Sequence, residues 1–230
     1  MNLLTTQNAK TSKGEEFQYL TGILYLKPFN TGGYKNVCPK ASEGCKKACL
    51  NTAGRGRFDR IQNGRQRKTD LYFNQMDKFF DILREDLRQL QIKAKNKGLI
   101  PCVRLNGTSD LPSLARKMAK EFPHIQFYDY TKLPNPHLRV LHNYHLTFSK
   151  SENNWLDCVK ALENGINVAV VFNVNSKNPL PKTYRGFKVL DGDKTDLRFV
   201  DKKGRTGYIV GLKAKGDARK DKSGFVVFDA

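Results

Sequence analysis

Three cysteines lie close together in the first quarter of the chain: Cys38, Cys45 and Cys49. The residues between and around them are mostly Pro, Ser, Glu, Gly and Lys, which favour an exposed loop over a buried core. Positive charge from nearby lysines favours the thiolate, which is the form of cysteine that binds metal ions. The sequence therefore predicts that the three sulfur atoms bind a metal.

Three sulfur ligands leave a fourth coordination position open. Such a set suits an iron-sulfur cluster with one accessible iron, and it also suits a zinc ion completed by histidine, carboxylate or water. His142 and His145 are the candidate histidines, but residues three apart in a strand point to opposite faces and need a turn to share one ion. A set of incidental thiols without metal is the third interpretation.

A disulfide framework fits the sequence poorly. The chain has five cysteines, an odd number, and Cys102 and Cys158 lie far from the other three in apolar segments. The amino terminus lacks the charged and long apolar regions of a signal peptide. We therefore expect the protein to lie in a reducing cytoplasm, which is that of the host cell if the protein is encoded by a phage.

Basic residues greatly outnumber acidic ones. With 41 Lys and Arg against 22 Asp and Glu, the formal net charge is +19, which predicts attraction to a polyanion and most simply to nucleic acid. Because lysines occur along the whole chain, a solvated basic surface without a ligand is the alternative. One local concentration follows the cysteines in a glycine-containing segment and is the candidate contact to phosphate: Arg55, Arg57, Arg60, Arg65, Arg67 and Lys68.

The elements that must position these residues follow from apolar patterning. We expect strands at residues 19–28, 100–105, 125–130, 144–148 and 168–172, with further candidates at 187–190, 208–212 and 225–228. A long helix is expected over residues 66–97, a short one over 114–122, and a third that contains Trp155, Leu156, Val159 and Leu162. Strands that alternate with helices predict an α/β class with mainly parallel pairing. We expect one globular domain over residues 1–230, and no apolar run is long enough to cross a membrane.

Polar residues follow each predicted strand, where ligand sites form in parallel α/β proteins. The groups are residues 106–110, 129–132, 149–152 and 173–175. Each group alone has a simpler explanation as a turn or a helix cap. Because the pattern recurs after successive strands, we expect these groups to surround the cysteine loop.

Six segments stand out as motifs: residues 2–4, 20–26, 38–50, 52–54, 104–110 and 127–132. Together they resemble a phage and prophage family called gene product 88-like, over nearly the whole chain. The order of the cysteine loop, Thr-Ser-Asp, Thr-Lys and Ser-x-Ser-Glu is also similar, more distantly, to the radical S-adenosylmethionine (radical SAM) superfamily. The cysteines here are separated by six and then three residues, whereas that superfamily usually has three and then two.

The second resemblance implies a partial (β/α) barrel of mainly parallel strands, radical SAM-like, with a [4Fe-4S] cluster held by the three cysteines. The fourth iron would bind S-adenosylmethionine, whose reductive cleavage yields a 5′-deoxyadenosyl radical. By position, Ser109 and Asp110 would hold the methionine end of this cofactor and Lys132 its carboxylate. Its ribose would contact Ser149, Ser151 or Glu152, and Asn106 belongs to the same cofactor-binding set.

The expected function is a phage-type iron-sulfur protein that acts on a nucleic acid or nucleotide. The alternative is a nucleic-acid-binding protein in which zinc or an iron-sulfur cluster is structural and no reaction is catalysed. A degenerate relative of an enzyme, serving as a phage accessory factor, is the third hypothesis.

Overall fold

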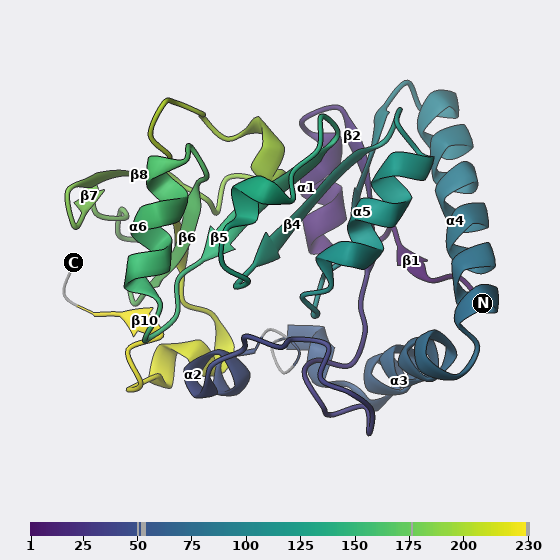
Figure 1. Ribbon diagram of the computed structural model, residues 1–230, viewed down its shortest axis with the longest axis horizontal. Helices are drawn as coiled ribbons and strands as arrows, with labels where there is room; N and C mark the ends of the chain where they lie inside the picture. The colour runs from purple at the N-terminus through teal and green to yellow at the C-terminus, as the bar shows by residue number, and fades with distance from the viewer. Residues whose placement is uncertain (50, 52–53, 176, 229–230) are drawn as a thin grey trace. The chain divides into compact units, whose positions relative to one another are not determined.

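The computed structural model describes residues 1–49, 51, 54–175 and 177–228 (Figure 1). The chain divides into two compact units. The first comprises Met1–Pro39, Arg57–Asp129 and Leu141–His145, and the second comprises Lys40–Gly56, Tyr130–Val140 and Leu146–Ala230. The expectation of a single domain stays a prediction, because compactness alone does not decide whether the two units fold cooperatively.

The first unit contains a parallel sheet with one antiparallel edge strand. Its strands are β1 (Leu4–Thr5), β2 (Tyr19–Leu24), β3 (Ile100–Arg104) and β4 (Gln126–Thr131), whose last two residues belong to the second unit. Parallel pairing joins β2 to β3 and β3 to β4, while β1 runs antiparallel to β2. The sequence predicted β2, β3 and β4 from their apolar runs, but two residues are too few to give a pattern for β1.

The helices of the first unit are α1 (Ala9–Glu15), α3 (Asp59–Asn74), α4 (Met76–Asn96) and α5 (Pro112–Glu121). Apolar side chains at intervals of three and four form the buried face of α4, which packs against β2 and β3: Phe79, Phe80, Leu83, Leu87 and Leu90. Full burial of each such side chain contributes about 1.5–3 kcal/mol. This face therefore anchors β2 and β3, which lead into the candidate site.

The prediction of one helix over residues 66–97 is wrong. The helical path begins earlier, at Asp59, and is interrupted at Gln75, whose φ of −141° and ψ of 59° are not helical. Figure 1 shows α3 and α4 meeting at a sharp bend there. Met76, whose position continues the apolar spacing of residues 66–97, is 48% exposed.

The second unit contains a larger set of strands. They are β5 (Tyr144–Ser149, which begins in the first unit), β6 (Val168–Phe172), β7 (Thr183–Tyr184), β8 (Phe187–Asp191), β9 (Ile209–Lys213) and β10 (Val226–Val227). Their order is β5-β6-β9-β8-β7, and β10 pairs with the end of β6. All of these pairings are parallel except that of β7 with β8.

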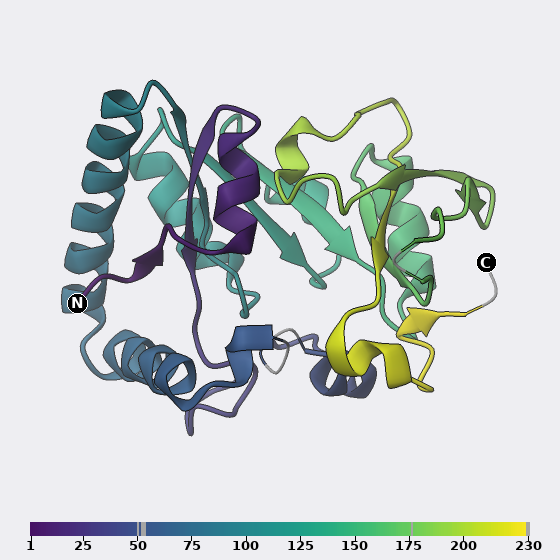
Figure 2. The same cartoon turned by 180° about the vertical axis from the view of Figure 1, so that it is seen from behind.

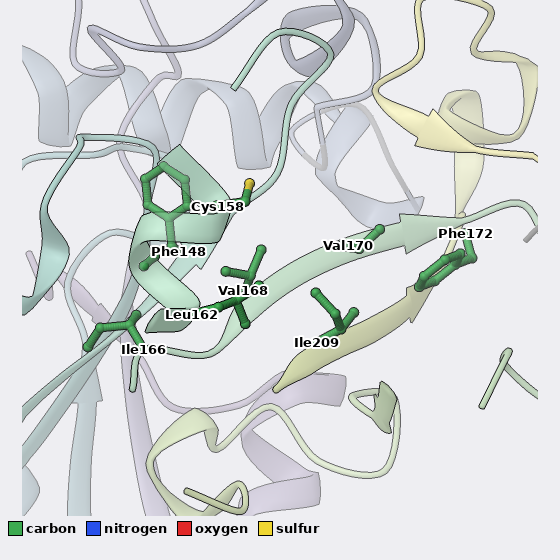
Figure 3. Close-up of a cluster of buried hydrophobic side chains, with 9 residues drawn as sticks. Phe148, Cys158, Leu162, Ile166, Val168, Val170, Phe172 and Ile209 are labelled. Atoms are coloured by element: carbon green, nitrogen blue, oxygen red, sulfur yellow. The ribbon is translucent and has the colours of Figure 1, made fainter. Parts of the chain in front are cut away.

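A buried apolar cluster forms the core of this second set (Figure 3). It joins α6 (Trp155–Glu163) to the faces of β5, β6 and β9, with Phe148, Leu162, Val168 and Ile209 among its members. The sequence placed Leu156 on the buried face of this helix, but Leu156 is 78% exposed. The buried positions are Cys158, Ala161 and Leu162.

The remaining elements are short. They are α2 (Glu43–Lys47) and the 3-10 helices η2 (Gly54–Arg57), η3 (Pro136–Leu138), η4 (Arg198–Val200) and η5 (Gly216–Lys220). Among the helices that the structure describes, none is both long and apolar enough to span a membrane. The α/β class and the mainly parallel pairing are confirmed. Neither set of strands closes on itself, and the partial barrel stays a prediction.

Candidate functional site

The five cysteines, all of which lie in the described part of the chain, fall into two classes. Cys38, Cys45 and Cys49 are half-buried, whereas Cys102 and Cys158 are fully buried, and none forms a disulfide. Burial raises the pKa of Cys158 to about 12, so this thiol stays protonated at neutral pH. The three cysteines of the loop are therefore the ones that a metal can reach.

Cys38 lies in the first unit, beside the loop that follows β3. Its Sγ accepts the backbone N–H of Phe29 at 3.4 Å and donates to the carbonyl oxygen of Thr108 at 3.5 Å. Two further hydrogen bonds fasten this loop: the Thr108 hydroxyl donates to the carbonyl of Leu26 at 2.5 Å, and the Asp110 N–H donates to the carbonyl of Val37 at 2.8 Å. Within this unit, the predicted contact between a cysteine and a strand-end loop is present.

Asn106 organises the loop that contacts Cys38. Its Oδ1 accepts the Ser109 hydroxyl at 2.9 Å and the Leu111 N–H at 2.8 Å. The following residue must be small, because a Cβ at Gly107 would lie 2.7 Å from the carbonyl oxygen of Leu24. The side chains of Asn106 and Ser109, both predicted to bind a cofactor, are thus hydrogen-bonded to each other.

Asp129 lies behind Asn106 and is fully buried. Its Oδ1 accepts the Asn106 N–H at 2.7 Å, and its Oδ2 accepts the Asn106 Nδ2 at 2.9 Å and the Tyr144 hydroxyl at 3.2 Å. Burial raises the pKa of Asp129 to about 7, although the hydrogen bonds from Asn106 and Tyr144 and the charge of Arg104 oppose that rise. Asp129 belongs to the strand-end group 129–132 that was expected to surround the cysteine loop, but its side chain is directed at Asn106 and Tyr144. A carboxylate inside an apolar strand is the signal that marks it.

In the second unit, Cys45 lies in α2 and Cys49 follows the end of this helix. Ser42 caps the helix, since its hydroxyl accepts the N–H of Cys45 at 3.2 Å. The N–H of Cys49 donates to the carbonyl of Lys46 at 3.3 Å, so the turn continues past the end of α2. Cys45 and Cys49 are thus joined by the end of α2 and the single turn that follows it.

Glu152, which follows β5, holds the start of α2. Its Oε2 accepts the Ser42 hydroxyl at 2.5 Å, and its Oε1 accepts the Gly44 N–H at 2.7 Å. The sequence predicted a contact between this strand-end group and the cysteine loop, and the contact is present in the second unit. Both oxygens of Glu152 face α2, so the structure makes Glu152 a positioning residue for the helix that carries Cys45.

The C-terminal segment packs against α2, and both views show the two side by side (Figures 1 and 2). A Cβ added to Gly44 would lie 2.1 Å from the Ser223 hydroxyl oxygen and 2.7 Å from the Phe225 Cβ. Ala48 packs against a small buried cluster of Ala214, Ala218 and Val226. Only glycine therefore fits at position 44.

The other residues predicted to bind a cofactor in the second unit are held by local contacts. The Ser151 N–H donates to the Asn154 Oδ1 at 2.6 Å, and the Ser149 carbonyl accepts the Asn154 Nδ2 at 2.9 Å. Asn154 thus folds the loop after β5, and its side chain makes no capping hydrogen bond to α6. The Lys132 Nζ lies 5.6 Å from the centre of the Phe225 ring.

The basic segment after the cysteines separates into outward-facing and inward-facing side chains. Arg65 is buried, with its guanidinium 5.2 Å from the centre of the Tyr25 ring. The Lys68 Nζ donates to the carbonyl oxygen of Leu3 at 2.6 Å, and burial lowers the pKa of Lys68 to about 8. The exposed members are Arg55 in the second unit and Arg57, Arg60 and Arg67 in the first.

The predicted metal ligands belong to different units, since Cys38 lies in the first and Cys45 and Cys49 in the second. His142 and His145, the candidate zinc ligands, both lie in the first unit. Over the residues that the structure describes, no group of three or more His, Cys, Asp or Glu side chains is arranged to hold a metal ion. The shared three-cysteine site thus stays a prediction. The motif residues Leu50, Thr52 and Ala53 lie outside the described residues.

Comparison with known proteins gives one result. A family model described as gene product 88 matches residues 2–228. No curated protein matches the chain, and no solved structure matches it.

Proposed function

The chain belongs to the gene product 88 family of phage proteins, and we propose that it is an iron-sulfur protein whose cluster is bound by Cys38, Cys45 and Cys49. The observation that carries this proposal is the difference in burial among the five cysteines. Two are buried, and the three from the loop are half-buried and accessible to metal. Thiolate ligands favour iron-sulfur clusters and zinc over harder metals.

The surroundings of the sulfurs fit the proposal. A backbone N–H is directed at the Cys38 Sγ, and hydrogen bonds to ligand sulfurs are one of the means by which proteins tune a cluster. Cys45 lies in α2, whose start is fixed by Ser42 and Glu152, and Cys49 follows in the turn after this helix. Such fixing matters because ligands that are held in place before binding lose less conformational entropy when the metal binds.

Three protein ligands leave one iron of a [4Fe-4S] cluster open, and S-adenosylmethionine is the second cofactor that we propose for it, on a radical SAM-like partial barrel. The residues proposed to contact it are Asn106, Ser109, Asp110, Lys132, Ser149 and Ser151. Glu152 is removed from the ribose-binding set, because both of its oxygens already accept hydrogen bonds from Ser42 and Gly44. The substrate that we propose is a nucleic acid or nucleotide in the host cell cytoplasm.

The test is anaerobic purification followed by iron, sulfide and zinc analysis and by absorption spectroscopy. We expect iron and sulfide in equal amounts and the broad visible absorption of a cluster. Zinc without sulfide would replace the iron-sulfur proposal with a zinc site. A protein that holds neither metal after anaerobic reconstitution would end the metal proposal.

Single variants assign the ligands. Cys38→Ser, Cys45→Ser and Cys49→Ser are each expected to lose most of the iron, because each removes one of three ligands. Cys158→Ala is the matched control, since this cysteine is buried in the core beside Leu162 and should leave the iron content unchanged. Equal iron content in the native protein and in Cys45→Ser would contradict the assignment.

A second function is favoured by the exposed arginines of the basic segment. Arg57, Arg60 and Arg67 are exposed in the first unit, and Phe58, which lies beside Arg57, is 57% exposed. Exposed arginines bind phosphate, and an exposed aromatic ring stacks on bases. The alternative is therefore a nucleic-acid-binding protein with a structural metal. It predicts salt-sensitive binding of DNA or RNA that does not depend on S-adenosylmethionine.

A further inference from the structure

A basic depression in the second unit is formed by two segments that are far apart in sequence. It has a volume of about 460 Å³ and is lined by Lys47 of α2 and by residues of the C-terminal segment, Lys220 and Lys222 among them. The packing of Gly44 and Ala48 against that segment brings the lysines together. Nothing in the local sequence around either segment indicates this juxtaposition.

The three lysines of the depression are available to a ligand. All three are exposed, and none forms an ion pair with another described residue. The lining also contains Asp217 and Asp221. Asp221 is turned into its own loop, where its carboxylate accepts the Ser223 hydroxyl at 2.6 Å and the Val226 N–H at 2.9 Å.

Asp221 stays charged, because its hydrogen bonds outweigh burial and hold its pKa below its ordinary value. The Asp221 carboxylate is already hydrogen-bonded to donors of its own loop, so it attracts a cation only weakly. Asp217 is exposed and is the other carboxylate of the lining, so three ammonium groups outnumber the two carboxylates and the lining favours an anion with several oxygens.

We propose that this depression binds phosphate groups of a nucleic-acid backbone. Further basic residues adjoin the lining residues in sequence. Arg219 is exposed, whereas Lys46 and Lys215 form ion pairs with Glu43 at 2.7 Å and Asp193 at 2.6 Å. The depression is open and its lysines come from two segments, which suits the phosphates of a polymer. The net charge of +19 steers such a polymer toward the protein.

The surface is separate from the proposed metal ligands, although both use α2. Successive residues of a helix are rotated by about 100°. Cys45 therefore lies on a different side of α2 from Gly44 and Lys47, which face the C-terminal segment as Ala48 does after the helix. The binding that we propose does not require the metal, so the failure of one proposal leaves the other standing.

The experiment measures fluorescence anisotropy of labelled single-stranded DNA, duplex DNA and RNA of equal length, at several salt concentrations. The test variant is the triple substitution Lys47→Ala, Lys220→Ala and Lys222→Ala. Its control is Lys160→Ala, Lys177→Ala and Lys203→Ala, three exposed lysines of the same unit outside the depression. The two variants lose equal charge, so the comparison removes the effect of net charge.

We expect the test variant to bind about tenfold or more weakly, with the slope of log K against log salt reduced by about 3. The control variant should bind nearly as tightly as the native protein, and a triple Lys→Arg variant of the depression should retain binding. Equal weakening in the test and control variants would overturn the proposal. Binding to anionic lipid vesicles but to none of the three nucleic acids would also overturn it.

Discussion

The carboxylate of Glu152 accepts the backbone N–H of Gly44 at 2.7 Å, across 108 residues of sequence. This bond and the one from the Ser42 hydroxyl connect the loop after β5 to the first turn of α2. A five-residue helix is too short to be stable alone, since helix nucleation is unfavourable. Glu152 therefore determines where the backbone that carries Cys45 and Cys49 is placed.

Replacement of Glu152 should loosen α2. Glu152→Ala removes the acceptor of two donors, and we expect a loss of about 1–3 kcal/mol of stability. Amide hydrogen exchange should speed up at residues 43–49. Iron content after reconstitution should fall, although no ligand is removed.

Two further variants at glutamates test this role. Glu152→Gln keeps one acceptor oxygen and should behave in an intermediate way. Glu163→Ala is the control, because Glu163 is an exposed glutamate of the same unit. Unchanged exchange at residues 43–49 in Glu152→Ala would show that α2 is held by other contacts.

Two glycine substitutions should have opposite effects. In Gly44→Ala the new Cβ would overlap the Ser223 hydroxyl and approach the Phe225 Cβ, so α2 must move or the C-terminal segment must shift. We expect a loss of about 1–3 kcal/mol, which is typical of overpacking. Gly64→Ala, inside α3, meets nothing within 4 Å and should stabilise the protein by about 0.5–1 kcal/mol.

Urea unfolding of both glycine variants provides the measurement. A second substitution, Ser223→Gly, removes the nearest atom and should recover part of the stability lost in Gly44→Ala. Equal stability of Gly44→Ala and the native protein would mean that the contact between α2 and the C-terminal segment is looser than the structure shows.

The parallel strands were predictable because their signal is local. A strand buried on both faces is a continuous apolar run, and residues 168–172 were predicted with the observed bounds of β6. The break between α3 and α4 was not predictable in this way. The apolar spacing passes through Met76 without a proline or glycine to interrupt it, so a local pattern contains no sign of the bend.

The candidate site was likewise predictable only where its sequence signal is local. The contact between Cys38 and the loop after β3 was expected from sequence, because polar residues at the end of a buried strand are conspicuous. The role of Glu152 was not predictable from sequence, because a carboxylate in a loop gives no indication that its partner is Gly44. Lys68 also resembles its exposed neighbours in sequence, and only burial against Leu3 distinguishes it.

Asp129 should make stability depend on pH. Its pKa is about 7 in the folded protein and about 4 in the unfolded chain. Between these values only the folded state holds the proton, so the free energy of unfolding falls as pH rises from about 4 to about 7. The expected fall is on the order of a few kcal/mol. Urea unfolding at a series of pH values, compared with Asp129→Asn, isolates this contribution.

A second buried carboxylate provides the control for this pH series. Burial raises the pKa of Asp201 to about 6. Asp201→Asn should therefore reduce the fall in the free energy of unfolding only below about pH 6. The fall between pH 6 and 7 should persist in Asp201→Asn and disappear in Asp129→Asn. Native and Asp129→Asn curves that run parallel over the whole range would contradict the protonation assigned to Asp129.

Arg67 and Lys68 are neighbours with equal charge and different surroundings, and they separate nucleic-acid binding from folding. Arg67 is exposed, so Arg67→Ala should weaken DNA binding and reduce the salt slope by about 1, with stability unchanged. Lys68 donates to the Leu3 carbonyl, so Lys68→Ala should cost about 1–3 kcal/mol of stability and leave binding almost unchanged. Anisotropy titrations and urea unfolding of both variants give the comparison. If both variants weaken binding equally, net charge rather than an arginine surface attracts the DNA, and the basic segment has no specific role.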